Sequence, residues 1–166
     1  MTSGSNRIVA IDVRPQRIGF AAFESAARIL DAGTRKMKSP DLIAKRIACL
    51  IAEFHPSVLI LRRIPPTSTR HRPRTRMIQR LIRHLAHRSG IAVVLIGERE
   101  LQDCFQRNAR LKKHEIATLL AKQYPEIAWK LPEKRKIYDR EAWSMVVFDA
   151  TALGIAYLAS GHQIKV

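Results

Sequence analysis

The fold is decided by the stretch Arg7-Ile8-Val9-Ala10-Ile11-Asp12-Val13-Arg14. Its apolar run ends at Asp12, and Pro15 and Gln16 then break the chain before a second apolar run begins at Ile18. This order is typical of a strand, a tight turn and a returning strand. A carboxylate at the end of a strand is held rigidly at a sheet edge, where it can serve a binding or catalytic site.

A second acid, Asp149, interrupts an otherwise apolar, helix-like run over residues 142–159. An unpaired buried carboxylate costs several kcal/mol, so such a residue needs a partner or a function. Two such acids from opposite ends of the chain predict one shared site, most plausibly for a divalent metal ion. The alternatives are that Asp12 is a turn residue bonded to following amides, and that Asp149 is a core acid paired with an arginine, with Arg62 as a candidate partner.

Strand-like and helix-like segments alternate along the rest of the chain. The predicted strands are 8–12, 18–23, 27–34, 58–61 and 91–96. The predicted helices are 39–54, 74–89, 98–106, 112–123 and 141–160, with a basic loop at 124–140 between the last two. This order predicts one α/β domain over residues 1–166, with a mixed sheet and helices on both faces.

Helical spacing of apolar residues predicts which side chains face the core. The apolar stripe of the helix at 39–54 includes Cys49, which is expected to be a core residue. The residues expected to face inward on the helix at 74–89 are Met77, Leu81, Ile82 and Leu85. Cys49 and Cys104 belong to no CxxC pair, which argues against a structural zinc site.

The charge of the chain indicates a polyanionic partner. Its 166 residues hold 30 lysines and arginines against 14 acids, a formal net charge of +16. The segment between Phe54 and Gly97 contains nine arginines and neither an acid nor a lysine, and guanidinium groups match phosphate geometry. Nucleic acid is the expected partner, and an anionic membrane surface is the weaker alternative. The arginines expected to contact nucleic acid are Arg62, Arg63, Arg70, Arg72, Arg74, Arg76 and Arg80.

The chain is expected to be cytoplasmic and to have no membrane partner. Residues 1–6 are short and polar, unlike a signal peptide. Asp149, Ser144 and Thr151 argue against a membrane span at 142–159. The aromatic residues in and beside the basic loop, which are expected either to stack on unpaired bases or to anchor the loop on the core, are Trp129, Tyr138 and Trp143.

Several of these segments carry a family likeness when they are taken in order. Residues 7–14, together with Gly19-Phe20-Ala21-Ala22-Phe23, resemble the opening of the RuvC-like branch of the ribonuclease H-like superfamily. Residues 56–61 and 148–153 are similar to later parts of the same pattern, and the likeness extends from Arg7 to Tyr157. The resemblance implies a five-stranded mixed sheet with helices on both sides. Members of this family cut nucleic acids, notably Holliday junctions, with carboxylate-bound Mg²⁺ or Mn²⁺.

The resemblance implies roles for three acids. Asp12 matches the acid that ends the first strand in the family, and Asp149 matches the acid on its last helix. Glu141, about two turns before Asp149, is expected to be a further acid near the site. Asp12, Glu141 and Asp149 are therefore the candidate catalytic residues, and Asp12 and Asp149 are the candidate ligands of Mg²⁺ or Mn²⁺.

The chain departs from the family pattern at two positions. Val146 stands where a partner acid often lies, one turn before Asp149. Arg62 stands where a glutamate normally ends the strand after the first helix. An arginine cannot ligate a metal ion and its charge opposes one, so the metal is expected to be absent if Arg62 occupies the site. Glu98, just past the next strand, is a candidate replacement for the missing carboxylate.

Two functions stay open at this point. One is a metal-dependent endonuclease that acts on branched DNA or structured RNA, with a homodimer expected by analogy. The other is a catalytically inactive module that binds nucleic acid or protein, in which Arg62 pairs with Asp12 or holds a phosphate. The strand order of the family places Asp12 and Arg62 at the ends of neighbouring parallel strands, which predicts an ion pair between them.

Overall fold

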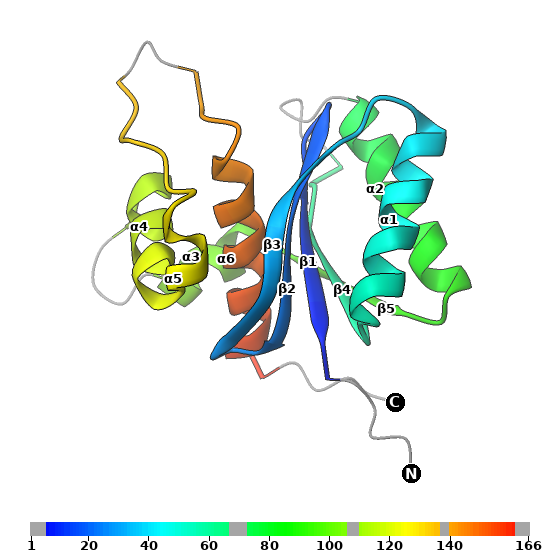
Figure 1. Cartoon of the computed structure of the whole chain (residues 1–166), viewed down its shortest axis with the longest axis horizontal. Coiled ribbons are helices and arrows are strands. Elements are labelled where there is room, and N and C mark those ends of the chain that lie inside the picture. Colours follow the sequence, from blue (N-terminus) through cyan, green and yellow to red (C-terminus); the bar gives the residue numbers. More distant parts are fainter. Residues whose placement is uncertain (1–5, 67–72, 106–109, 137–139, 162–166) are drawn as a thin grey trace.

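Five strands form one mixed sheet at the centre of the structure (Figure 1). The computed structural model describes residues 6–66, 73–105, 110–136 and 140–161. The strands are β1 Ile8–Val13, β2 Arg17–Ser25, β3 Arg28–Lys36, β4 Val58–Arg62 and β5 Ala92–Ile96. Their order across the sheet is β3-β2-β1-β4-β5, with β1 to β3 antiparallel and with β4 and β5 parallel to β1. The predicted five-stranded mixed sheet is confirmed.

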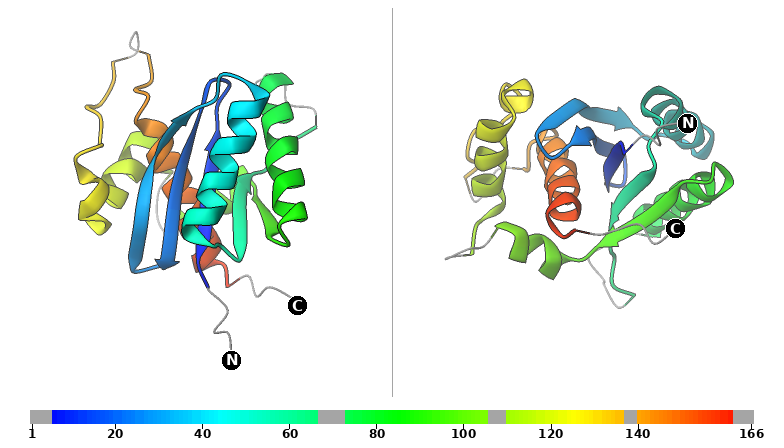
Figure 2. Two further views of the ribbon diagram at one scale, coloured as in Figure 1. Left: turned by 45° about the vertical axis from the view of Figure 1, so that its right-hand side comes forward. Right: turned by 90° about the horizontal axis from the view of Figure 1, so that it is seen from below.

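Helices cover both faces of this sheet, as predicted (Figures 1 and 2). On one face lie α1 Pro40–Phe54 and α2 Pro73–Arg88. On the other face lie α3 Glu98–Phe105, α4 Lys113–Gln123, α5 Pro125–Ala128 and α6 Met145–Ala159. Of these, α6 packs directly on β1 and β2, while α3 and α4 pack on α6. Among the described helices, none is long and apolar enough to cross a membrane.

Two predictions near the end of the chain, one of a loop and one of a helix, are wrong in detail. The predicted loop at 124–140 begins with a short helix, α5, because Pro125 suits the first turn of a helix. The last helix begins at Met145 rather than at residue 141. The side chains that pack on the sheet are continuously buried only from Met145 onward, and helical structure in proteins depends on such packing.

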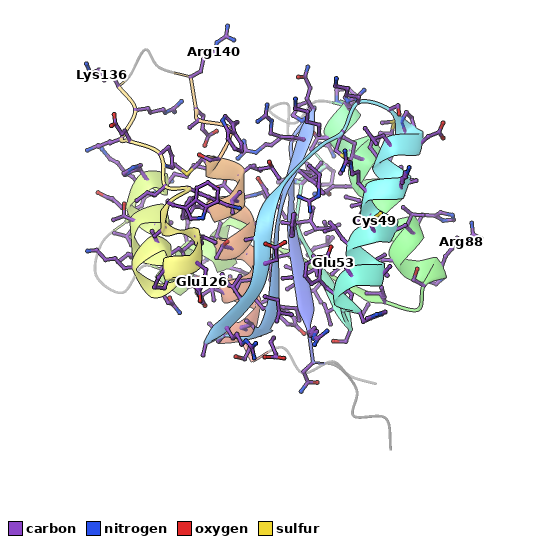
Figure 3. The ribbon with its side chains drawn as sticks, in the orientation of Figure 1. Cys49, Glu53, Arg88, Glu126, Lys136 and Arg140 are labelled. Carbon is purple, nitrogen blue, oxygen red and sulfur yellow. The ribbon has the colours of Figure 1, made fainter. Side chains whose placement is uncertain are left out.

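Two predicted core residues are exposed instead. On α1 the buried positions are Ile43, Ile47, Leu50 and Phe54, and Cys49 lies outside this stripe and is exposed (Figure 3). On α2 the buried positions are Thr75, Ile78, Gln79, Ile82 and Ala86. Met77 points away from this stripe and is 39% exposed. On α1 the buried stripe is apolar and Cys49 lies beside it, whereas on α2 the polar residues Thr75 and Gln79 are buried and Met77 is not.

Gly19 sets how closely α6 approaches the sheet. It lies on β2 directly opposite Asp12 of β1. A Cβ atom at this position would come within 2.2 Å of the Val146 carbonyl oxygen on α6. The missing side chain therefore allows α6 to cross the sheet at the level where β1 ends. Because Asp149 lies one turn after Val146, this close approach brings the two buried acids, Asp12 and Asp149, into one region.

Candidate functional site

The site begins where two neighbouring parallel strands end. Ile11 of β1 pairs with Leu61 of β4, so Asp12 and Arg62 follow side by side. The Nε atom of Arg62 donates to Oδ1 of Asp12 at 3.2 Å. The predicted ion pair is therefore confirmed. On α2, the buried Gln79 amide donates to the Arg62 carbonyl oxygen at 2.9 Å and fixes the end of β4.

Arg14 joins the two buried acids to each other. Its Nε donates to Oδ2 of Asp12 at 3.0 Å, and its Nη2 donates to Oδ2 of Asp149 at 2.6 Å. A third guanidinium nitrogen, Nη1, lies 3.6 Å from Oε2 of Glu141. Asp149 is thus paired with an arginine, but this arginine is Arg14 and not Arg62. No role was predicted for Arg14, although strand alternation places residues 12 and 14 on the same face.

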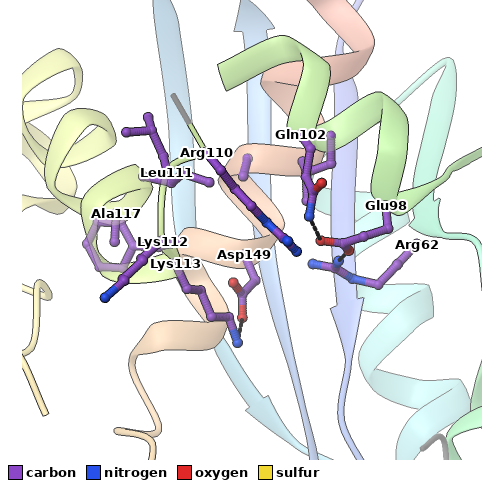
Figure 4. Close-up of a pocket in the computed structure, with 13 residues that line it drawn as sticks. Arg62, Glu98, Gln102, Arg110, Leu111, Lys112, Lys113, Ala117 and Asp149 are labelled. Carbon is purple, nitrogen blue, oxygen red and sulfur yellow. Dashed lines mark hydrogen bonds and ion pairs between the residues drawn. The ribbon is translucent and has the colours of Figure 1, made fainter. Parts of the chain in front are cut away.

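Lys113, at the start of α4, is a third cation at this site. Its Nζ lies 3.0 Å from Oδ2 of Asp149 and also pairs with Oε1 of Glu141 (Figure 4 shows the first of these contacts). Glu141 precedes α6 instead of lying on it, yet its carboxylate still reaches the site. Glu98 pairs with Nη1 of Arg62 at 2.7 Å. We name this set the ionic cluster; its members are Asp12, Arg14, Arg62, Glu98, Lys113, Glu141 and Asp149.

Burial sets the electrostatics of the ionic cluster. Asp12 is 3% and Asp149 is 5% exposed. Burial, together with the charge of Asp12, raises the pKa of Asp149, although Lys113 and Arg14 oppose this shift. Burial alone would also raise the pKa of Glu141, but the hydrogen bond and charge of Lys113 and the charge of Arg14 lower it.

The two arginines of the ionic cluster stay charged. Burial by itself lowers the pKa of the Arg14 guanidinium, but the charges of Asp12, Asp149 and Glu141 outweigh burial and raise it. The pKa of Arg62 is raised in the same way, against burial, by the charge of Asp12 above all. Both guanidinium groups are therefore permanent cations between the acids.

The donor set of this site does not fit a divalent metal ion. Mg²⁺ and Mn²⁺ prefer carboxylate oxygens, but both oxygens of Asp12 accept hydrogen bonds from guanidinium groups. Oδ2 of Asp149 is shared by Arg14 and Lys113. Within residues 6–66, 73–105, 110–136 and 140–161, no group of three His, Cys, Asp or Glu side chains is arranged to hold a metal. Three cations take the place that metal ions would need.

The other arginines expected to contact nucleic acid have different surroundings. Arg63 pairs with Glu100 at 3.2 Å and donates to the Leu95 carbonyl. Arg76 donates to the Pro65 carbonyl at 2.9 Å. Arg80 is exposed on α2. Arg70 and Arg72 lie outside the described residues.

The guanidinium group of Arg74 binds backbone carbonyl groups of the protein itself. This group donates to the carbonyl oxygens of Pro15 and Met37, each at 2.6 Å, and to that of Lys38 at 3.0 Å. These bonds hold the β1–β2 turn, the segment after β3 and the start of α2 together. Arg74 therefore shapes the surface beside the ionic cluster, whatever else it contacts.

Trp129 and Trp143 do not anchor the basic loop on the core. Trp129 is 78% exposed and Trp143 is 61% exposed, and Lys130 lies over the Trp129 ring at 5.1 Å from its centroid. Tyr138 lies outside the described residues. Lys136 and Arg140, on the segment between α5 and α6, extend away from the rest of the structure (Figure 3).

A groove lined by cations adjoins the ionic cluster at the end of β1. It consists of two cavities of about 770 and 800 Å³, which share Pro15, Gln16 and Arg17. We name it the basic groove. The cations that line it are Arg14, Arg17, Lys36, Lys38, Arg62, Arg74 and Lys113. Two acids, Asp12 and Glu98, also line the groove, so its lining carries an excess of positive charge.

Comparison with solved structures finds the same architecture in Holliday junction resolvases. Thermus thermophilus RuvC in complex with a Holliday junction substrate aligns over 93% of this chain and 96% of its own, with a TM-score of 0.67 and 15% identity. The yeast mitochondrial Holliday junction resolvase aligns over 93% and 78%, with a TM-score of 0.65 and 11% identity. The fowlpox virus resolvase in complex with Holliday junction DNA aligns over 92% and 99%, with a TM-score of 0.57 and 14% identity.

Comparison with known sequences finds no relative of this chain. No protein-family model matches the sequence, and no curated protein matches it. The likeness to the resolvases is therefore one of fold, and it covers most of the chain. The chain has the ribonuclease H-like fold of RuvC and related Holliday junction resolvases.

Proposed function

We propose that this protein binds branched DNA or structured RNA along the basic groove, and that the ionic cluster replaces the metal ions used by nucleases of this fold. The observation that carries the proposal is that Arg14 and Arg62 both donate to Asp12. A carboxylate held by two guanidinium groups is neutralised without a metal. Such a site does not supply the free carboxylates that a two-metal cleavage needs.

The register of the sheet supports an anionic ligand in the basic groove. Arg17 of β2 lies directly opposite Lys36 of β3, and like charges in this position destabilise a sheet. Neither side chain makes an ion pair with any residue in the described part of the chain. A phosphate between the two cations relieves their repulsion. The net charge of +16 adds a long-range attraction for any polyanion.

A metal-dependent endonuclease is the second candidate function. Its support is that Asp12, Glu141 and Asp149 all gather around Arg14, as descent from a nuclease predicts. Cleavage would require Arg14 and Arg62 to leave the buried Asp12, and Arg14 and Lys113 to leave the buried Asp149. The homodimer expected from the resemblance stays a prediction.

The salt dependence of binding tests the groove. Changing Arg17, Lys36 and Lys38 together to alanine is expected to weaken binding to a four-way DNA junction. The slope of log K against log salt should become less steep by about 2–3, because each lost phosphate contact removes about 0.9. The measurement is fluorescence anisotropy over a series of KCl concentrations.

A matched control removes three exposed cations that line neither the groove nor the cavities beside it. These are Lys45 on α1, Arg99 on α3 and Lys122 on α4. This control variant has the same net charge as the groove variant and should keep most of the wild-type slope. Equal slopes for the two variants would remove the basic groove from the interface.

A further inference from the structure

A cavity of about 500 Å³ continues from the basic groove into the layer formed by α3, α4 and α6 (Figure 4). It shares Arg62, Glu98 and Lys113 with the basic groove. Its apolar wall consists of Leu101, Leu111, Ile116, Ala117, Phe148 and Ala152. Pockets of this size, mostly apolar with a few polar groups, are typical of small-ligand sites. We name it the α3–α4 cavity.

Charged groups lie on both sides of the α3–α4 cavity, and apolar side chains form part of its wall. Figure 4 shows Leu111 and Ala117 on one side together with Lys112 and Lys113, and it shows Arg62, Glu98 and Gln102 on the other. The polar side is already organised, because Gln102 donates to Glu98, which in turn accepts from Arg62. An apolar wall beside an organised polar side suits a ligand that has a flat apolar body and a hydrogen-bonding edge.

Arg110 supplies the charge that selects an anion. It lines the α3–α4 cavity, and its side chain points toward the side that holds Glu98 and Arg62 (Figure 4). Arg110 makes no hydrogen bond or ion pair with the residues that the structure describes. Arg62 and Lys113, by contrast, are engaged by the acids of the ionic cluster. Arg110 is therefore a cation at the cavity with its donors available for a phosphate.

We propose that the α3–α4 cavity receives one unpaired nucleotide of the bound nucleic acid. The base packs on the apolar wall, and the phosphate of the same nucleotide accepts hydrogen bonds from Arg110. This inference rests on the proposed function, because the strand reaches the cavity from the basic groove. It specifies the kind of substrate: a branched structure with an unpaired nucleotide at the branch, rather than a fully paired duplex.

The test uses two four-way DNA junctions that differ in one position. One carries a single unpaired adenine at the branch point, and the other carries an abasic nucleotide there. The full-length wild-type protein is expected to bind the first about tenfold more tightly, since burying one base removes a large apolar area from water. Anisotropy titrations at one salt concentration give both affinities.

Two variants separate the cavity from the groove. Ala152→Leu fills the cavity from α6, and Arg110→Ala removes its available cation from an exposed position that does not threaten folding. Ala152→Leu is expected to reduce the tenfold preference for the unpaired base to about twofold or less, since the base loses its place in the cavity. Arg110→Ala should weaken binding to both junctions, because both retain the phosphate. Lys122→Ala, an exposed cation on α4, is the control and should change neither affinity.

The possible outcomes are distinct. A wild-type protein that binds both junctions equally tightly overturns the inference while leaving the proposed function standing. A base preference that survives in folded Ala152→Leu overturns it as well. Binding of adenosine 5′-monophosphate alone, with no base preference on the junctions, assigns the cavity to free nucleotides and also overturns it. No binding to either junction removes the proposed function and this inference together.

Discussion

Replacing Arg14 with alanine is expected to lower the melting temperature by about 5–10 °C at pH 7. The loss leaves Asp12 and Asp149, which are nearly fully buried, without the cation that joins them. Breaking a buried ion pair costs about 3–5 kcal/mol, and the 36% exposure of the Arg14 side chain reduces this to about 2–3 kcal/mol through solvent screening. Thermal unfolding followed by circular dichroism measures the shift.

Arg17→Ala is the matched control for this experiment. Arg17 lies three residues away and makes no ion pair with any described residue, so its loss should change the melting temperature little. Adding Asp12→Asn to Arg14→Ala should restore part of the stability, because it removes one of the two buried charges that have lost Arg14. A melting temperature that is equal in the Arg14 and Arg17 variants would show that Arg14 does not hold the buried acids.

The loss of folding stability caused by Arg14→Ala should depend on pH in a defined direction. Burial and the charge of Asp12 raise the pKa of Asp149, and Arg14 is one of the charges that oppose this rise. Without Arg14 the pKa of Asp149 rises further above its unfolded value, so the folded state holds its proton more tightly. Stability is then lost as the pH rises through the folded pKa. The loss of folding stability in Arg14→Ala, relative to the wild type, should be larger at pH 8 than at pH 5. The reverse order would contradict this account.

Exchanging both arginines that bind Asp12 is expected to create a divalent metal site. Arg62→Glu supplies a carboxylate at the end of β4, and Arg14→Gln removes the cation between Asp12 and Asp149. Arg62→Glu alone is not enough, because Arg14 still bonds to both acids. The double variant should melt about 5–10 °C higher in saturating Mn²⁺, since a ligand at 100 times its Kd adds about 2.7 kcal/mol. Wild-type protein should show no such shift.

A second double variant, Arg14→Gln with Arg62→Gln, separates metal binding from the loss of positive charge. It removes the same two cations but adds no carboxylate, so it should respond to Mn²⁺ weakly. In the absence of metal the Arg62→Glu variant should be the less stable of the two, because it crowds a carboxylate beside Asp12. Equal Mn²⁺ shifts in the two variants would mean that residue 62 does not face the acids in the way the sheet register implies.

Much of the fold was predictable because it follows from local patterns. Local sequence signals mark three of its elements: the strand that carries Asp12, the turn at Pro15 and the helix that starts at Pro40. The pairing of Asp12 with Arg62 followed from the strand order that the resemblance implies. Two side chains were placed wrongly: Cys49 and Met77 are exposed, because packing against the sheet selects which part of each helix is buried.

The partners of the acids were less predictable, because they come from distant parts of the chain. Lys113 reaches Asp149 only because α4 packs on α6, which no local pattern states. Glu141 was expected on the last helix, and it reaches Arg14 from the segment before that helix. Arg74 was predicted to contact nucleic acid, and the structure shows that its guanidinium bonds to three carbonyl oxygens. Only Arg14 had a usable signal, the strand alternation that places it beside Asp12.

The central claim is that cations have taken the place of catalytic metal ions in a nucleic-acid-binding protein of this fold. Purified full-length protein incubated with a labelled four-way DNA junction, or with branched RNA, in Mg²⁺ or Mn²⁺ tests it most directly. Binding is followed by gel shift and cleavage by a denaturing gel. The account predicts a shifted junction with every strand intact. Metal-dependent cutting that disappears in Asp12→Asn would contradict it.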